Sequence, residues 1–338
     1  MRAIVWSLHQ NTVFRRTIDL LEQYGFEHET CIGSITECRE ALEGSWSTVD
    51  AVLCISPVAL CVRMISPLLR GKRIDPAVIT LSPLGKTAIP IIGDHRGGAM
   101  LCEFLSDKIG CRCVETSLSS EKGSLSLDDL AFRLRLEPVN AGHGLFEELV
   151  KKLAYNNRVS VYVDDSVMRV LKSMRDDRVR RLFDNTVRAS SPSDAELCLV
   201  KDTSECGECS GCCLVMKKIA VGLGFCSTAR ISDVMNALNE VLGIFGFPLN
   251  RVDVIAVPSI RAGHPVVKEL GSHGLRVEIV DVGEAREHGV PNPQARHGVR
   301  SLCEAVARTV LGGGKTLITK ARFGNVTVSI VEEELEDA

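Results

Sequence analysis

The stretch GDHRGGAMLCEF, residues 93–104, places a histidine and an arginine in a glycine-containing turn. It follows the apolar run TAIPII and leads into a segment with helical periodicity, so it predicts a strand that turns and continues as a helix. Glycines let such a turn expose backbone amides at a helix start, where the peptide dipoles favour an anion. His95 and Arg96 beside those amides indicate a carboxylate or phosphate site with an imidazole able to transfer a proton. An ordinary turn with a surface histidine and arginine is the alternative.

A second group of reactive side chains lies in the cysteine-rich segment ECGECSGCC. It places two residues between Cys206 and Cys209 and between Cys209 and Cys212, with Cys213 adjacent and Cys198 upstream across an expected hairpin. Cys-x-x-Cys spacing directs two thiolates at one metal ion, as in zinc and iron–sulfur sites. Cys206, Cys209 and Cys212 are therefore candidate ligands of a structural zinc or iron–sulfur site. Because a second knuckle is missing, a disulfide or free thiols are the alternatives.

Other motifs lack residues that their chemistry requires. Gly222 and Gly224 follow an expected strand, but Phe225 comes next and the third glycine of a dinucleotide fingerprint is absent. The stretch LGGGKT has Thr309 where a P-loop needs its first glycine, and it follows a helix. The chain contains no His-Glu-x-x-His metal motif and no Gly-x-Ser-x-Gly elbow. Nicotinamide binding, a P-loop and serine-hydrolase chemistry are therefore not supported.

The composition limits the partners that the chain can have. Its 338 residues include 40 Lys and Arg against 43 Asp and Glu, so the net charge of −3 provides no global basic field for nucleic acid or an anionic membrane. The first residues do not form a secretory signal, and no apolar run reaches the roughly 18 residues of a membrane helix. We therefore expect a cytoplasmic protein whose 14 cysteines are buried thiols or metal ligands rather than a disulfide framework.

Apolar β-type runs alternate with helical patterns along the chain, which predicts an α/β fold. The run PAVITLSPLGKTAIPII predicts a hairpin that turns on Ser82 to Gly85. We expect two three-layer α/β domains at the ends, joined by a smaller α/β middle domain that finishes in the cysteine-rich hairpin. The expected boundaries are 1–117, 118–215 and 216–338.

The longer motifs resemble one family. CVRMISPLLRGKRIDPAV followed by IPIIGDHRGGAMLCEFLSDKIG resembles the amino-terminal domain of cobalamin biosynthesis protein G, the cobalt-precorrin-5A hydrolase family. LDDLAFRLRLEP resembles the opening of that family's middle domain, and IAVGLGF, GVRSLCEAVA and LITKARFGNVTVSI resemble its carboxy-terminal domain in order. The resemblance spans nearly the whole chain, and its most specific part is the Asp-Pro-Ala-Val strand together with the His-x-Gly-Gly-Ala turn.

The resemblance implies a reaction of vitamin B12 synthesis. The δ-lactone of a cobalt-bound, ring-contracting tetrapyrrole is opened and acetaldehyde is released, which gives cobalt-precorrin-5B in the anaerobic route. On this hypothesis His95 is the general base, and the Gly97 and Gly98 amides donate hydrogen bonds to the oxyanion. Glu304 is expected to face the same cleft as a second proton-transfer group, although a helix-surface charge is its alternative role.

The same resemblance suggests how the carboxylate-edged substrate is held. Arg63 and Arg96 would bind carboxylates through two hydrogen bonds each. The full set of expected substrate-binding residues is Arg63, Asp75, Arg96, Gly97, Gly98 and Lys320. Because a flat macrocycle needs a large concave surface, we expect the cleft between the two terminal domains.

Cobalt arrives within the tetrapyrrole substrate, so the reaction requires no further cofactor, and zinc or an iron–sulfur cluster would serve only the cysteine site. The expected partner is the cobalt-precorrin itself, with a homodimer or a complex with another cobalamin-pathway enzyme left open. Asp94 and Met100 stand where the family usually has glycine and asparagine. A non-catalytic tetrapyrrole carrier or scaffold is therefore the alternative function, and a cysteine-cluster metal or redox protein is a third.

Overall fold

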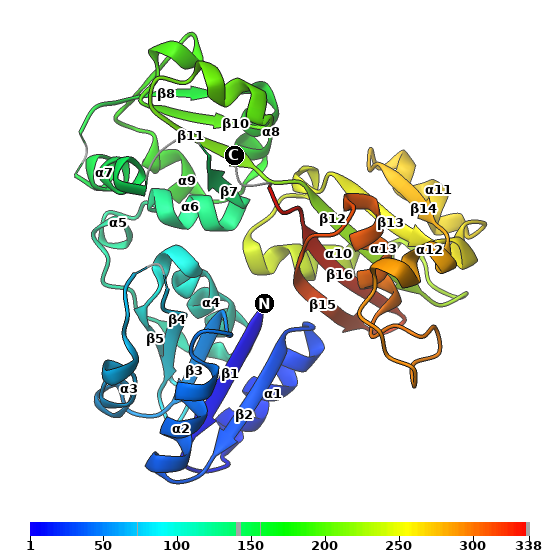
Figure 1. Ribbon diagram of the computed structural model, residues 1–338, viewed down its shortest axis with the longest axis horizontal. Helices are drawn as coiled ribbons and strands as arrows, with labels where there is room; N and C mark the ends of the chain where they lie inside the picture. The colour runs from blue at the N-terminus through cyan, green and yellow to red at the C-terminus, as the bar shows by residue number, and fades with distance from the viewer. Residues whose placement is uncertain (73, 140–142, 156, 336–338) are drawn as a thin grey trace.

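The computed structural model describes residues 1–72, 74–139, 143–155 and 157–335. Figure 1 shows three α/β units: an amino-terminal one in blue and cyan, a middle one in green, and a carboxy-terminal one in yellow to red. Three sheets form their centres. The expected α/β architecture is confirmed, with two larger units at the ends of the chain and a smaller one between them. Within the described residues, no helix is both long and apolar enough to span a bilayer.

The amino-terminal domain is built on a six-stranded sheet in the order β2-β1-β3-β4-β5-β6. The strands are β1 (Arg2–Ser7), β2 (Glu27–Ile32), β3 (Ala51–Ile55), β4 (Ala77–Leu81), β5 (Thr87–Ile92) and β6 (Arg112–Cys113). The helices are α1 (Thr12–Gln23), α2 (Ile35–Ser45), α3 (Val58–Ile65) and α4 (Gly98–Leu105), with the short turns η1 (Ser66–Leu68), η2 (Asp94–Arg96) and η3 (Ser106–Gly110).

Both faces of this sheet are covered by helices. Trp6 of β1 packs with Leu42 on the α2 side, while Val5 belongs to the opposite core with Leu21 of α1. Alternate residues of a strand point to opposite faces, so one apolar strand supplies both cores. The predicted hairpin is confirmed, because β4 and β5 pair antiparallel around a turn in which the Gly85 amide donates to Ser82 O at 2.7 Å.

The middle domain follows α5 (Leu118–Glu121) and has the strand order β7-β11-β10-β8-β9. Its strands are β7 (Leu136–Pro138), β8 (Val159–Val163), β9 (Thr186–Arg188), β10 (Leu197–Val200) and β11 (Cys212–Met216). Its helices are α6 (Leu127–Leu134), α7 (His143–Ala154), α8 (Asp165–Ser173) and α9 (Asp177–Leu182), with the turns η4 (Pro192–Asp194) and η5 (Thr203–Glu208).

The cysteine-rich segment is a crossover and not the expected hairpin, since β10 and β11 pair parallel through η5. Its thiols also do not converge on one metal. Cys206 is bonded to Cys213 and Cys209 to Cys198, whereas Cys212 points into the separate core of the middle domain. Since two of the three candidate ligands are bonded to other sulfurs, the expected zinc or iron–sulfur ligand set is wrong.

The amino-terminal domain also contains a disulfide that the sequence does not predict. A third bond joins Cys102 of α4 to Cys113 of β6, and eight of the cysteines are free thiols. The spacing of 11 residues between the two gave no indication of pairing, because only the fold of α4 back onto the sheet brings their backbones to a Cα distance of 5.6 Å.

The carboxy-terminal domain has the order β14-β13-β12-β16-β15. Its strands are β12 (Ile219–Phe225), β13 (Val254–Pro258), β14 (Val277–Val280), β15 (Lys315–Phe323) and β16 (Val326–Glu332). Its helices are α10 (Ile231–Phe245), α11 (Pro265–Ser272), α12 (Val282–His288) and α13 (Leu302–Leu311), with the turns η6 (Leu249–Arg251) and η7 (Ser259–Arg261). The expected closing pair of strands is confirmed, because β15 and β16 are antiparallel neighbours.

The two terminal domains share one hydrophobic core. Tyr24, after α1, packs edge-on against Phe104 of α4 and Phe323 of β15, with ring centroids 5.0 and 5.2 Å apart. Its hydroxyl donates to a carboxylate oxygen of Glu240 on α10 at 2.6 Å. Buried aromatic contacts of this kind hold the domains together and fix the walls of the junction between them.

Candidate functional site

The turn that contains His95 and Arg96 joins β5 to α4 through η2. Gly93 and Gly97 both adopt left-handed backbone, with φ of 86° and 87°. A Cβ on Gly93 would lie 2.5 Å from Ala77 Cα, and one on Gly97 would lie 2.3 Å from Phe132 Cε1. Glycine is therefore required at both positions for backbone angle and for space. The predicted strand–turn–helix is confirmed.

The glycine amides do not point at a ligand. Gly97 N donates to Asp94 O at 3.0 Å, and Gly98 N donates to Gly93 O at 3.0 Å. Both donors are used inside the turn, so the expected oxyanion role of Gly97 and Gly98 is not supported by the geometry. Their contribution is to shape the turn that presents His95 and Arg96.

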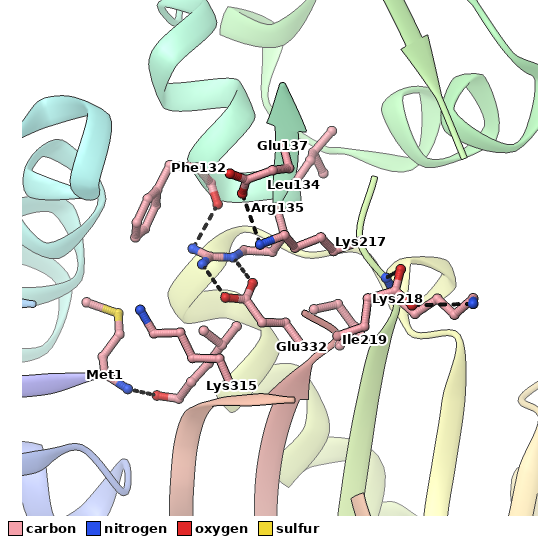
Figure 2. Close-up of polar contacts among 12 residues, drawn as sticks. Met1, Phe132, Leu134, Arg135, Glu137, Lys217, Lys218, Ile219, Lys315 and Glu332 are labelled. Carbon is pink, nitrogen blue, oxygen red and sulfur yellow. Dashed lines mark hydrogen bonds and ion pairs between the residues drawn. The ribbon is translucent and has the colours of Figure 1, made fainter. Parts of the chain in front are cut away.

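A cavity of roughly 460 Å³ lies beside His95 where the three domains meet. The amino-terminal domain contributes Arg96, the middle domain Phe132 and Arg135, and the carboxy-terminal domain Lys315 and Glu332. The middle domain thus forms one wall of a cleft that we expected from the terminal domains alone. Figure 2 shows Arg135, Lys315 and Glu332 directed toward the same space from different domains.

Positive side chains surround this cavity, each beside a carboxylate. Lys72 Nζ lies 3.0 Å from Asp128. Lys217 Nζ lies 2.9 Å from Glu137, and Lys315 Nζ lies 3.1 Å from Asp50. Ion pairs at a partly exposed cavity wall contribute little to stability. Their lysines are therefore available to exchange a protein carboxylate for one on a ligand.

His95 is the proton-transfer candidate of this cavity. Its ring is half-buried, and Nε2 is fully shielded with no hydrogen-bond partner within the described part of the chain. Burial lowers the pKa of His95 below 6.5, and the nearby charges of Lys72 and Arg96 lower it further. The imidazole is consequently neutral at pH 7 and able to accept a proton. A buried nitrogen without a hydrogen-bond partner destabilises the unliganded site.

A second hollow of roughly 700 Å³ adjoins the first at His95. His95, Lys72 and Asp128 line both spaces, so the histidine stands between them. The wall of the second hollow also includes Asp129 of α6, the helix that packs on the η2 turn. Together the two spaces provide a concave region within the size range of organic ligand sites.

Asp129 is the most perturbed carboxyl of this region. It is 6% exposed, and its Oδ1 has no partner among the described residues. Burial raises the pKa of Asp129 to about 7, with the charge of Arg133 opposing the shift and Glu103 and Glu115 adding to it. A carboxyl that titrates near neutrality is suited to proton transfer. No sequence pattern distinguishes it, because acids in the first turn of a helix are common.

Glu103 forms ion pairs with two arginines close to Asp129. Its carboxylate accepts from Arg133 at 2.6 Å and from Arg178. These two cations outweigh the burial of Glu103 and lower its pKa, so it stays ionised at neutral pH. Asp129 therefore keeps an ionised acid nearby, which favours its protonated form.

Two of the expected substrate-binding residues lie apart from the first cavity. Arg63, on α3, is exposed and does not line the wall around His95. Asp75 lies in the wall of the second hollow but is occupied, because it accepts from the Arg70 and Gly71 amides and from the Trp46 indole. These bonds outweigh burial and lower the pKa of Asp75. Arg63 is thus separated from the site, and Asp75 shapes the loop that carries Lys72.

The two carboxy-terminal candidates are separated from His95 as well. Glu304 is 1% exposed and accepts from Arg300 at 2.6 Å and from Thr316 at 2.8 Å. It orients Arg300 toward Glu27 of the amino-terminal domain and does not line the cleft. Lys320 lines a different hollow, at the far end of β15. The expectation that Glu304 and Lys320 share a cleft with His95 is therefore wrong.

The comparisons with known proteins bear on the whole chain. The family model described as Cobalamin synthesis G N-terminal matches residues 40–120, and the one described as Cobalamin synthesis G C-terminus matches residues 219–331. Two curated proteins named cobalt-precorrin-5A hydrolase are similar to it. The Salmonella typhimurium protein is 32% identical over 91 residues, 27% of this chain and 26% of that protein. The Priestia megaterium protein is 20% identical over 309 residues, 86% of this chain and 81% of that protein.

One solved structure shares the fold along nearly the full length. A cobalamin biosynthesis protein G homolog from Sulfolobus solfataricus superposes with a TM-score of 0.58 at 17% identity, over 98% of this chain and 97% of that one. The two family models together match more than half of the 338 residues and occur in the same order as the terminal domains. With the motifs around His95 and Lys320, these findings show that the chain belongs to the cobalamin synthesis G family.

Proposed function

We propose that this chain is a cobalt-precorrin-5A hydrolase, which opens the δ-lactone of its cobalt-bearing macrocycle and releases acetaldehyde. Two relatives carry that name, and both match the chain in sequence. The observation that carries the proposal is a neutral imidazole at a junction of three domains, in a wall where lysine and arginine side chains lie beside carboxylates.

The lysines of the cavity can bind the carboxylate edge of the substrate. Lys72, Lys217 and Lys315 reach the cavity from separate segments, and each has a carboxylate partner that a substrate carboxylate can replace. Arg96 lines the same wall and presents a planar guanidinium, which binds a carboxylate through two hydrogen bonds. The flat ring would lie across Phe132, whose aromatic face is already covered on one side by Arg135 at 4.7 Å.

Lactone opening requires a base and a stabiliser of negative charge. The His95 imidazole takes a proton from water while the water oxygen bonds to the lactone carbonyl carbon, and it returns this proton to the leaving oxygen as the acyl carbon–oxygen bond breaks. The products of this step are a carboxylate and an alcohol. The positive charges of Lys72 and Arg96 stabilise the oxyanion, a role that the internally bonded glycine amides do not fill.

Release of acetaldehyde requires a second proton transfer. The new alcohol loses its proton, the carbon–carbon bond to the macrocycle breaks, and the electron pair stays in the conjugated ring, which takes up a proton. Asp129 titrates at about pH 7, so it can accept and return a proton under the same conditions. We assign it this role in place of Glu304, whose carboxylate is bonded to Arg300 and Thr316.

The test is acetaldehyde formation on incubation with the lactone substrate. We expect release by the unaltered chain and a loss of at least about 100-fold in kcat for His95→Ala, the usual contribution of a general base. His9→Ala, which alters an exposed histidine outside the cavity, should retain full activity. Tight binding of the lactone without any acetaldehyde would instead identify the chain as a carrier. Unchanged turnover by His95→Ala would remove its assigned role.

A further inference from the structure

A separate hollow of roughly 330 Å³ lies in the carboxy-terminal domain, where β12 and β13 end. Its lining includes Phe225 and Pro258, the last residues of these strands, together with Lys320 of β15 and Thr327 of β16. The cavity beside His95 instead contacts Lys315, at the start of β15, and Glu332, at the end of β16. The two spaces therefore lie at opposite ends of one sheet, about 20 Å apart along β12 at roughly 3.3 Å per residue.

The charges around this hollow are of one sign. Arg261 and Lys320 line it, and no aspartate or glutamate does. Among the described residues, neither Arg261 nor Lys320 has an acidic side chain within ion-pair distance. His297 completes the polar wall, and burial together with Arg296 and Arg286 lowers its pKa, so it is a neutral hydrogen-bonding group at pH 7.

Two aspartates of this domain accept hydrogen bonds at helix starts. Asp233 accepts from the Arg230 amide at 2.9 Å at the start of α10. Asp281 accepts from the Gly283 amide at 2.7 Å at the start of α12. The thiol of Cys303, on the floor of the hollow, is fully buried, which raises its pKa and keeps it neutral. No protein group in the lining therefore neutralises Arg261 and Lys320.

The remaining lining is apolar. Phe225, Ile260 and Leu302 provide hydrophobic surface, while Asn325 and Thr327 add neutral hydrogen-bonding groups. Gly224 belongs to the wall, and a Cβ there would lie 2.5 Å from Thr327 Oγ1, so a larger residue would displace that hydroxyl. A pocket with apolar walls and a few polar groups of one charge is typical of sites for small organic ions.

We propose that this hollow is a second ligand site, which binds a small organic anion with an apolar body and a carboxylate or phosphate group held by Arg261 and Lys320. Arginine and lysine are the side chains that most often bind carboxylate and phosphate groups. Because the hollow lies at the other end of the sheet from His95, its ligand is a separate molecule from the one in the three-domain cavity. The inference does not depend on the hydrolase reaction.

Cys226 provides a reporter inside the site. It lines the hollow, is partly exposed, and lies with its sulfur 3.1 Å from the Thr228 hydroxyl. Hydrogen bonds from the Thr228 hydroxyl and amide lower the pKa of this thiol, which favours the thiolate that alkylating reagents attack. Its modification can be followed by peptide mass spectrometry in the whole chain.

The experiment compares alkylation of Cys226 by iodoacetate, which is an anion, and by iodoacetamide, which is neutral. Arg261→Gln and Lys320→Gln should each lower the iodoacetate-to-iodoacetamide rate ratio at Cys226 by threefold or more. Lys268→Gln, which removes an exposed cation of α11 outside the hollow, is the matched control and should leave the ratio unchanged. In the unaltered chain, phenylacetate or inorganic phosphate should protect Cys226 from iodoacetamide, whereas neutral phenylacetamide should not.

Protection by phenylacetate with weaker protection by phosphate supports a carboxylate ligand with an apolar body, and the reverse supports a phosphate ligand. An unchanged rate ratio in both variants overturns the proposal. So does equal protection by phenylacetamide, or protection that sodium chloride at the same ionic strength reproduces.

Discussion

Arg135 and Glu332 form a two-point ion pair that joins the middle domain to the carboxy-terminal domain. The Arg135 Nη2 to Glu332 Oε1 distance is 2.8 Å, and a second hydrogen bond runs from Nε to Oε2. The Glu332 side chain is 2% exposed and that of Arg135 12%. Arg135 ends α6 in left-handed backbone with φ of 58°, which is unusual for a residue other than glycine. The structure thus retains a strained residue where its guanidinium links two walls of the cavity.

Glu332→Gln should destabilise the protein strongly, because it leaves the Arg135 guanidinium buried without its counter-charge. We expect the free energy of unfolding to fall by about 3 kcal/mol, measured by chemical denaturation. Glu333→Gln is the matched control. It removes a pair with the largely exposed Lys218, and a change of no more than about 1 kcal/mol is expected. Equal losses for the two variants would contradict the role of the Arg135–Glu332 pair.

Gly97→Ala should cost more stability than Gly110→Ala. Both glycines have positive φ, so both substitutions carry a backbone penalty of about 1 kcal/mol. A Cβ on Gly110 meets open space, whereas one on Gly97 would overlap the Phe132 ring. The added overpacking should cost a further ~1–3 kcal/mol in the free energy of unfolding. If the two variants have the same free energy of unfolding, the Cβ on Gly97 does not overlap the Phe132 ring, and the contact between the turn and α6 is looser than the geometry indicates.

Asp129→Asn should change the pH dependence of stability. The folded pKa of Asp129 is about 7 and its ordinary value is 3.8, so the folded protein holds a proton between these pH values that the unfolded chain releases. The contribution of Asp129 to stability therefore falls as pH rises through this window. The variant should match the parent near pH 4 and exceed it at pH 8, by up to about 4 kcal/mol.

Urea denaturation at both pH values measures this difference, and Asp19→Asn, at an exposed site on α1, serves as the control. A stability gain that is the same at pH 4 and pH 8 would argue against the raised pKa of Asp129.

The pH profile of acetaldehyde release should report His95. Its pKa is lowered by burial and then by Lys72, so kcat/KM should rise with pH with an inflection below the ordinary histidine value of 6.5. Lys72→Gln removes one neighbouring charge and should move the inflection to higher pH. Lys86→Gln, an exposed lysine that does not line the cavity, should leave it in place. An inflection that Lys72→Gln does not move would disprove this coupling.

Thiol titration should distinguish the disulfides from a metal site. Unfolding the oxidised protein without reductant should expose eight reactive thiols, and reduction should raise the number to the full 14. Release of zinc or iron together with 14 thiols before reduction would restore the metal hypothesis for Cys206, Cys209 and Cys212.

The parts of the fold that depend on local pattern were predictable. The hairpin around Ser82 and Gly85 and the glycine turn before α4 follow from residue preferences over a few positions. The predicted hairpin of the cysteine-rich segment is wrong because β10 and β11 pair parallel, with β8 on the other side of β10. That strand order depends on long-range packing and not on the spacing of the cysteines.

The sequence by itself determined the alternation of strands and helices, the family motifs, and the placement of His95 and Arg96 on a glycine-shaped turn. Only the tertiary structure decided which distant side chains meet there. Asp129 acquires its raised pKa from burial by other segments, and Lys315 joins the cavity because β15 begins at the domain junction. Lys320, five residues later, reaches a different hollow, since a strand advances about 3.3 Å per residue and carries it toward the opposite end of the sheet.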